Sequence, residues 1–247
     1  MRKSTAALLS GLTFFLLWEG YVRLAGVSSK ILPPPSAALK ALWEFRAPLF
    51  RIHLPMTLNE VILGFGLALL LGILLGLAIH RWRLLELALY PLIIASQTVP
   101  TIAISPVFLW WFGYSLKQKV AVIVLITFFP IAIGLYDGLK SADREQIDLL
   151  KAMGASRWQI LRLVEWPSAL PSLLTATKLA AAAAVVGATI GEWLGGESGL
   201  GYFGRRMNTQ WRVDALFASV LLLSFLGIVG VLLVGALERS LLRWRSK

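Results

Sequence analysis

One run of 23 residues, from Ala215 to Leu237, contains no charged side chain. As an α-helix rising 1.5 Å per residue, this run is long enough to cross the roughly 30 Å hydrocarbon core of a bilayer. The whole chain is similarly apolar: 57% of its residues are hydrophobic and 15% are charged. A typical soluble domain carries about 25% charged residues. The sequence therefore predicts an integral membrane protein.

Five further apolar runs approach or reach the length of a spanning helix. They are Ser4–Trp18, Val61–Ile79, Leu87–Trp111, Val120–Tyr136 and Pro171–Gly191, the last interrupted only by Lys178. A transmembrane β-barrel would instead show segments of about ten residues with alternating polarity. We therefore expect an all-α, polytopic membrane protein with about six transmembrane helices, forming a single domain over residues 1–247.

The charged residues fit a chain held in a membrane. A net charge of +11 would suit a nucleic-acid ligand, but basic residues in membrane proteins usually flank the spans, so we expect no nucleic acid. The N-terminal run resembles a secretory signal without a convincing cleavage site, which indicates a retained anchor with the N-terminus inside. This orientation places 13 basic residues inside and 10 outside. Because that excess is small, the basic tail ERSLLRWRSK after the last span is the better local signal of orientation.

The sequence lacks the residues of most catalytic and cofactor sites. There is no cysteine, and the two histidines, His53 and His80, are too scattered for a histidine metal cluster. No G-x-x-x-x-G-K-[ST] phosphate loop occurs. The G-x-G-x-x-G match at 199–204 follows a predicted span rather than a strand, which indicates a chance match in a glycine-rich loop. We expect no metal, no cofactor and no enzymatic activity in this chain.

Prolines shape the segment after the first predicted span. Three consecutive prolines in SSKILPPPSAALKAL predict an extended stretch. A short amphipathic helix is expected over Ser36–Phe50, outside the membrane or in its interface, and Pro55 then introduces the second span.

Prolines also interrupt the Leu87–Trp111 run. Pro91, Pro100 and Pro106 remove backbone donors, and the freed carbonyls at membrane depth are tolerated mainly where they are buried or line a wet cavity. The polar residues here that could line a translocation pathway include Gln97, Thr98 and Thr101. The alternative is a bent, packed helix whose hydroxyls bond their own backbone, and the sequence leaves both interpretations open.

Glycines at four-residue spacing predict close helix packing in two spans. Gly72 and Gly76 form a G-x-x-x-G pair in one span. The small-residue face of another span is Gly187, Gly191 and Gly195. Glu192 lies at the outer end of that second span. An acid at this depth indicates either a hydrogen bond to a neighbouring helix or loop, or contact with a translocated solute.

A charged stretch, KAMGASRWQILRLVEWPSALP (Lys151–Pro171), separates two predicted spans. Ser141 is expected to cap a first helix, and Gly154 to follow its end in the left-handed conformation. Ser156 and Gln159 match the S-x-x-Q capping box, so a second helix is expected to begin at once.

Two prolines are expected to mark the end of this stretch. Pro167 should end the second helix, and Pro171 should lie in the first turn of the next span. The resulting pair of helices could be an amphipathic loop lying on lipid. It could equally be a docking element that inserts into a groove on a cytoplasmic partner, which the tight turn and double capping favour.

The spacing from Asp148 to Pro167 resembles a signature of the permease subunits of binding-protein-dependent ABC importers. Here D-L-L-x-x-x-G, nine residues and V-x-W-P stand where the signature has E-A-A-x-x-x-G, nine residues and I-x-L-P. The LPPPSAAL, VPTIAISPVFLWWFG and GEWLGGESGLGYF segments resemble the sulfonate, taurine and nitrate branch of these permeases. The chain also resembles permeases for pyrimidine-type thiamin precursors.

The resemblance implies a type I ABC importer permease-like fold in the cytoplasmic (inner) membrane of a bacterium. It implies membrane lipid, two ATP-binding cassette ATPase subunits, an extracytoplasmic substrate-binding protein and a second permease copy, identical or paralogous, as partners. Transport of a sulfonate, taurine, nitrate or a pyrimidine-type thiamin precursor would be driven by ATP hydrolysis in the separate subunit. A cytoplasmic coupling loop at about 140–170 would contact that subunit. The loop residues that the resemblance singles out are Asp148, Gly154, Ala155, Ser156, Arg157, Trp158 and Pro167.

A self-sufficient secondary transporter or channel is the alternative function. It would need buried ion-coupling acids in mid-span or an inverted repeat, and the sequence offers only Glu19 and Glu192 with no clear repeat. An intramembrane enzyme is disfavoured by the missing nucleophile and metal clusters.

Overall fold

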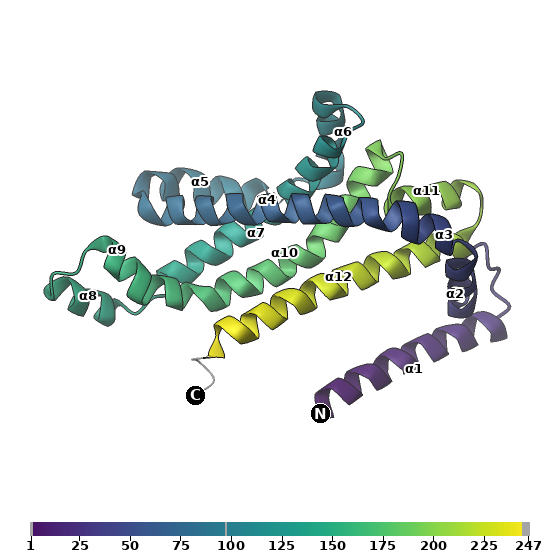
Figure 1. Ribbon diagram of the computed structural model, residues 1–247, viewed down its shortest axis with the longest axis horizontal. Coiled ribbons are helices and arrows are strands. Elements are labelled where there is room, and N and C mark those ends of the chain that lie inside the picture. Colours follow the sequence, from purple (N-terminus) through teal and green to yellow (C-terminus); the bar gives the residue numbers. More distant parts are fainter. Residues whose placement is uncertain (1, 97, 244–247) are drawn as a thin grey trace. The chain divides into compact units, whose positions relative to one another are not determined.

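The computed structural model describes residues 2–96 and 98–243, with side chains from Leu9 onward. Every regular element in these ranges is a helix (Figure 1), so the all-α prediction is confirmed. The chain forms two compact units. The first unit consists of the residues up to Thr57 together with Gly196–Ser224. The second unit consists of Leu58–Gly195 together with the residues from Phe225 onward. The expectation of a single transmembrane domain stays a prediction.

The first unit contains the N-terminal helices and the connection between the last two long helices. Its elements are α1 (Arg2–Leu24), α2 (Pro35–Glu44), α3 (Arg46–Pro48), the π-helical turn η1 (Leu49–His53), α11 (Leu200–Thr209) and the beginnings of α4 (Leu54–Arg81) and α12 (Val213–Leu241). The helix predicted over Ser36–Phe50 is present as α2 and α3. Pro35 starts α2, where the missing N–H of a proline leaves no hydrogen bond unmade.

α11 begins where two side chains accept hydrogen bonds from its first N–H groups. Gly199 N donates to His53 Nδ1 at 3.1 Å, and Leu200 N donates to Thr57 Oγ1 at 2.8 Å. Gly199 has a φ of 117°, which L side chains rarely adopt. Gly204 lies so close to α12 that a Cβ would not fit. The G-x-G-x-x-G match therefore starts a helix, and the expectation of a glycine-rich loop was wrong.

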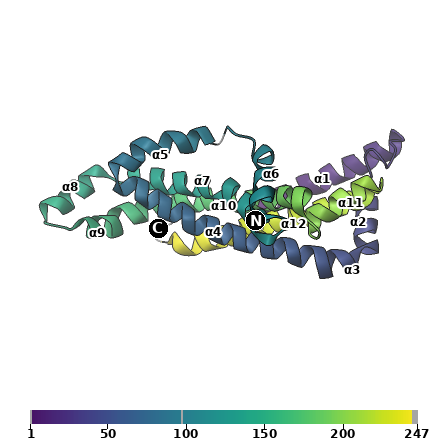
Figure 2. The same cartoon turned by 90° about the horizontal axis from the view of Figure 1, so that it is seen from above.

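The second unit is built on α4, α7 (Leu116–Lys140) and α10 (Trp166–Gly195). Its other elements are α5 (Arg83–Ser96), α6 (Thr101–Phe112), α8 (Arg144–Ala152), α9 (Arg157–Ile160), the π-helical turn η2 (Leu161–Glu165) and the end of α12. Both views show α4, α7 and α10 running alongside one another, with α8 and α9 as a hairpin that projects beyond the ends of α7 and α10 (Figure 1 and Figure 2). The buried core between α7 and α10 consists of Ile131, Leu135, Leu139, Ala169, Leu173 and Ala180.

The two predicted glycine faces let these helices approach closely. A Cβ on Gly72 would come 2.8 Å from the Ile131 side chain of α7, and a Cβ on Gly76 would come 2.8 Å from the carbonyl oxygen of Ala132. The face of α10 that also lies against α7 is that of Gly187, Gly191 and Gly195. Larger residues at these positions would force the helices apart. Both packing predictions are confirmed.

The predicted number of six spans is not confirmed. The described helical stretches that are long and apolar enough to cross a bilayer are Arg46–Arg81, Leu116–Lys140, Arg157–Gly195 and Val213–Leu241. In place of the predicted Leu87–Trp111 span, α5 and α6 meet at 103° and make a fifth crossing only if the broken pair counts as one. The break falls at Pro100, whose ψ of 113° is extended. α1 covers the predicted Ser4–Trp18 run, but the structure describes its side chains only from Leu9 onward, so this span stays a prediction.

Candidate functional site

The segment between α7 and α10 folds as two short helices joined by a tight turn. Asp143 caps α8, and its carboxylate accepts a hydrogen bond from Glu145 N at 2.9 Å. Ser141, the predicted cap, lies two residues earlier and donates its hydroxyl to Gly138 O at 2.7 Å. The prediction was wrong because α7 extends to Lys140 and makes Ser141 its own C-cap.

Gly154 follows the end of α8 in the left-handed conformation, with a φ of 79°. Gly154 N donates to Lys151 O and Ala155 N donates to Leu150 O, both at 2.9 Å. This pair of bonds is a Schellman motif, which satisfies the last carbonyls of a helix while the chain reverses. No described atom lies within 4 Å of the place of a Cβ on Gly154, so glycine is needed there for its backbone conformation alone. The predicted turn residue is confirmed.

α9 starts with the predicted capping box. Gln159 N donates to Ser156 Oγ at 3.3 Å, and Ser156 N donates to Gln159 Oε1 at 2.6 Å. Two N–H groups that a helix start would otherwise leave free are therefore satisfied. With the turn set at Gly154 and the cap at Ser156, the tip of the hairpin has little conformational freedom.

The second helix does not end at Pro167, contrary to prediction. The chain passes from α9 through η2 into α10, and Pro167 is the second residue of α10. The same arrangement occurs earlier in the chain, where η1 leads directly into α4 and Pro55 is the second residue of α4. A π-helical turn shifts the hydrogen-bond register directly before each proline, which lets the helix continue despite the missing donor. Pro171 accordingly lies inside α10 rather than in its first turn.

The predicted loop residues are only partly brought together. The five consecutive residues Gly154–Trp158 form the turn and the start of α9. Asp148 lies on α8, where it pairs with Lys151 at 2.9 Å. Pro167 is half-buried in α10, away from the turn.

The hairpin exposes apolar side chains near its turn. Leu149, Met153 and Trp158 are 62%, 74% and 69% exposed. Exposed apolar side chains that gather among charged neighbours are typical of surfaces that contact another protein or a membrane. The roles of the individual loop residues stay predictions.

The base of the hairpin is fastened to the helix bundle. His80 Nε2, at the end of α4, lies 3.1 Å from Glu165 Oε2 of η2, and both side chains are largely buried. Leu161 and Trp166 pack against the α7–α10 core. A cavity of about 1140 Å³ lies between the end of α4 and the hairpin.

The four residues predicted to line a pathway have different surroundings. Gln97 lies outside the described residues. Thr98 is exposed and donates its hydroxyl to Ala95 O at 2.7 Å, which is the local bonding of the alternative interpretation. Thr101 is the first residue of α6, and Glu192 is fully buried in α10. Their assignment to a pathway stays a prediction.

Glu192 belongs to a buried charged cluster with Glu60 of α4 and Lys119 of α7. Lys119 Nζ lies 2.6 Å from Glu60 Oε1, and the Glu192 carboxyl interacts with that of Glu60. Both glutamates are 0% exposed and Lys119 is 6% exposed. Buried charges of this kind persist only when they are paired. The cluster supports the interpretation that Glu192 bonds to a neighbouring helix.

Glu60 and Lys119 were not predicted as functional or structural partners of Glu192. All three stand one residue outside a predicted span, on the same predicted side of the membrane, and that shared position is the signal that could have found them. Two further buried side chains, Gln118 and Ser105, carry polar atoms with no hydrogen-bond partner among the described residues.

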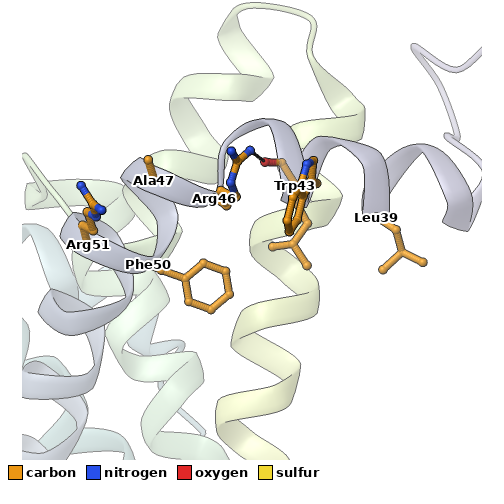
Figure 3. Close-up of a pocket in the computed structure, with 7 residues that line it drawn as sticks. Leu39, Trp43, Arg46, Ala47, Phe50 and Arg51 are labelled. Atoms are coloured by element: carbon orange, nitrogen blue, oxygen red, sulfur yellow. Dashed lines mark hydrogen bonds between the residues drawn. The ribbon is translucent and has the colours of Figure 1, made fainter.

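A second hollow, of about 630 Å³, lies on α2, α3 and η1 of the first unit. Figure 3 shows Leu39, Trp43 and Phe50 among its lining residues. Arg46 packs over the Trp43 ring at 4.4 Å and donates to Trp43 O at 2.9 Å. Because apolar groups dominate the lining and Arg46 is engaged locally, the hollow presents no chemical site.

A family of known transport proteins matches residues 68–243. It is described as the inner membrane component of binding-protein-dependent transport systems, and the match includes α7, the hairpin and α10. The chain belongs to this family. As such a permease it is a multi-pass protein of the bacterial inner membrane.

Related permeases cover the chain almost from end to end. The formylaminopyrimidine transport permease ThiX of Halalkalibacterium halodurans is 45% identical over 250 residues, 100% of each chain. The riboflavin permease RibX of Chloroflexus aurantiacus is 36% identical over 94% of this chain and 87% of RibX. The putative aliphatic sulfonates permease SsuC of Bacillus subtilis is 29% identical over 93% of this chain and 84% of SsuC.

A solved transporter shares the fold. A chain in an inward-facing structure of the MetNI methionine ABC transporter matches 85% of this permease and 98% of its own length with a TM-score of 0.61. At 22% identity this likeness shows the fold alone. The predicted ABC importer permease fold is confirmed, apart from the number of spans.

Proposed function

We propose that this permease moves a small solute into the cytoplasm as part of an ABC importer, driven by ATP hydrolysis in a separate subunit. The observation that carries the proposal is the geometry of the α8–α9 hairpin. Its turn is set by Gly154, and its second helix begins with the capping box of Ser156 and Gln159. A loop that only lay on lipid would need no such defined geometry. A rigid tip with exposed apolar side chains suits insertion into a groove on a partner.

The connections of the hairpin would carry a movement of its tip into the spans. The hairpin continues through η2 into α10 without a break, and His80 and Glu165 join its base to α4. A push on the tip by two approaching ATPase subunits would therefore shift α4 and α10 together. We expect this shift to switch a pair of permease chains, identical or paralogous, between inward-open and outward-open states.

We propose a pyrimidine of the formylaminopyrimidine kind as the solute. ThiX, whose name gives that solute, is 45% identical over the whole chain, against 36% for RibX and 29% for SsuC. An external binding protein would deliver the solute to the outward-open state.

Reconstitution tests the proposal. The full-length permease is placed in liposomes with the ATPase and the binding protein that co-purify with it, and uptake of formylaminopyrimidine, riboflavin and taurine is compared with and without ATP. ATP-dependent uptake of the pyrimidine supports the proposal. ATP-dependent uptake of taurine alone would contradict the proposed pyrimidine solute but would still support the ATP-driven mechanism. Uptake by the permease alone without ATP would favour a secondary transporter and contradict the mechanism.

A further inference from the structure

Two buried polar side chains of α6 and α7 have no hydrogen-bond partner. Ser105 of α6 and Gln118 of α7 are both 0% exposed. Neither the Ser105 hydroxyl nor the nitrogen and oxygen of the Gln118 amide is paired with any residue that the structure describes. A buried polar group without a hydrogen bond costs free energy, so native proteins keep few of them. Groups that are kept at such a cost are candidates for contact with a ligand or with water.

Both side chains belong to the region where α6, α7 and α10 contact one another. A Cβ on Gly195 of α10 would come 2.8 Å from Gln118 Oε1 and 3.0 Å from Leu109 Cδ1 of α6. Ser105 precedes Leu109 by four residues, so the two share one face of α6. This face packs inward, because Ser105 is fully buried. The inner face of α6 therefore lies against the start of α7 and the end of α10.

α6 is joined to its neighbours by non-helical residues at both ends. Pro100 before it has a ψ of 113°, and α5 and α6 meet at 103°. Gly113 after it has a φ of 65°, and no described atom lies within 4 Å of the place of a Cβ there, so glycine is needed for its backbone conformation alone. A short helix between two such joints can turn as a unit, because a few residues absorb the change in backbone angles. Such a turn would uncover Ser105 and Gln118.

We propose that Ser105 and Gln118 bind the solute in transit, after α6 has turned away from α7 and α10. This inference rests on the proposed function, because it needs a transport cycle that opens the spans. The Gln118 amide offers a donor beside an acceptor, which matches the amino group and the neighbouring ring nitrogen of an aminopyrimidine, as glutamine matches adenine. The Ser105 hydroxyl supplies a further donor or acceptor. The end of α10 is predicted to face outside, where a binding protein would deliver the solute.

Thiol labelling tests whether the inner face of α6 opens. The chain contains no cysteine, so Ser105→Cys places a single small thiol at the site of the hydroxyl, and Thr127→Cys is the control. Thr127 of α7 is also 0% exposed, but its hydroxyl donates to Ile123 O at 2.7 Å. Each full-length variant is assembled with the ATPase and the binding protein that co-purify with it. A water-soluble methanethiosulfonate is added during ATP turnover, and mass spectrometry follows labelling of the permease.

We expect Ser105→Cys to be labelled roughly tenfold faster than Thr127→Cys, since an open state populated to only a few per cent is enough to admit the reagent. Saturating formylaminopyrimidine should slow this labelling. Equal rates for the two thiols would overturn the proposal. Labelling that a transported pyrimidine leaves unchanged would also overturn it, because Ser105 would then face water only. A wild type that takes up no pyrimidine would instead contradict the proposed solute, and the labelling rates, which need only ATP turnover, would still decide whether α6 moves.

Replacement of Gln118 by leucine separates a solute contact from a structural role. Gln118→Leu removes the unpartnered amide, so the midpoint of thermal unfolding should equal or exceed that of wild type. Pyrimidine uptake per ATP hydrolysed should fall about tenfold, the loss expected for one hydrogen bond. Thr127→Val should show the reverse, a lower midpoint with unchanged uptake, because it removes a hydroxyl that is already paired. A Gln118→Leu variant with a lower midpoint and unchanged uptake would assign the amide to a structural buried water and overturn the proposal.

Discussion

Lys119 of α7 and Glu60 of α4 form a 2.6 Å ion pair in which both side chains are almost fully removed from solvent. Glu192 of α10 interacts with the same pair, so three long helices meet at one cluster of charges. Removing one member of a buried pair leaves the others without compensation, and this costs more than the pair itself contributes.

Lys119→Met is therefore expected to lower the free energy of unfolding by about 3–5 kcal/mol. Lys117→Met, two residues away and exposed, should change it by about 0.5 kcal/mol or less. Denaturant titration of the full-length permease in detergent measures both. Adding Glu60→Gln to Lys119→Met should restore part of the loss. A Lys119 variant as stable as the Lys117 variant would show that the cluster is unimportant for stability.

The turn of the hairpin depends on the positive φ of Gly154. Gly154→Val should cost about 1–2 kcal/mol of local stability, because a β-branched residue is strained in the left-handed conformation. Capture of the ATPase by the tagged permease should fall while the amount of inserted permease stays the same. Gly154→Asn is the matched control, since asparagine tolerates this conformation, and it should capture the ATPase nearly as wild type does. Equal capture by the valine and asparagine variants would refute this role for the turn.

The capping box of α9 makes a separate prediction. Ser156→Ala removes the hydroxyl that accepts from Gln159 N and should cost about 1 kcal/mol, so the turn should be cut faster by a protease under native conditions. Ser141→Ala should have little effect, because that hydroxyl only donates back to Gly138 O. Faster cleavage of the Ser141 variant would indicate that Ser141 does cap α8, as the sequence predicted.

Two glycines of α4 should respond differently to the same substitution. Gly76→Ala would place a Cβ 2.8 Å from the carbonyl oxygen of Ala132 and should destabilise the permease by about 1–3 kcal/mol. Gly66→Ala has no described atom within 4 Å and should be neutral or stabilising, because alanine favours the helix over glycine by about 1 kcal/mol. Thermal unfolding of the two variants compares them directly. Similar midpoints would mean that α4 and α7 are not closely packed.

The local chemistry of the hairpin was predictable from the sequence. A left-handed glycine and an S-x-x-Q box depend on neighbours in the chain, and both Gly154 and Ser156 behave as predicted. Pro167 was misjudged because a proline signals a helix end only when the hydrogen-bond register is regular. The π-helical turn before it changes that register, and no residue pattern in the sequence predicted this turn.

The buried cluster was not predictable by the same reasoning. The predicted spans begin directly after Glu60 and Lys119, so both residues fell one position outside them and their burial was not foreseen. Their burial depends on glycine faces such as Gly191, which brings α10 against the backbone of Lys119. Pairing between residues 59 positions apart is a property of helix packing, which a single sequence does not display.

The central claim is that the tip of the hairpin contacts the ATPase subunit, and photo-crosslinking from Met153 tests it most directly. The chain contains no cysteine, so Met153→Cys offers one reactive thiol, at a position 74% exposed, for a benzophenone maleimide. Ile31→Cys, 77% exposed and predicted on the opposite side of the membrane, is the control. On illumination of the assembled complex, we expect a permease–ATPase adduct from position 153 and none from position 31. No adduct from position 153, or equal adducts from both positions, would contradict the account.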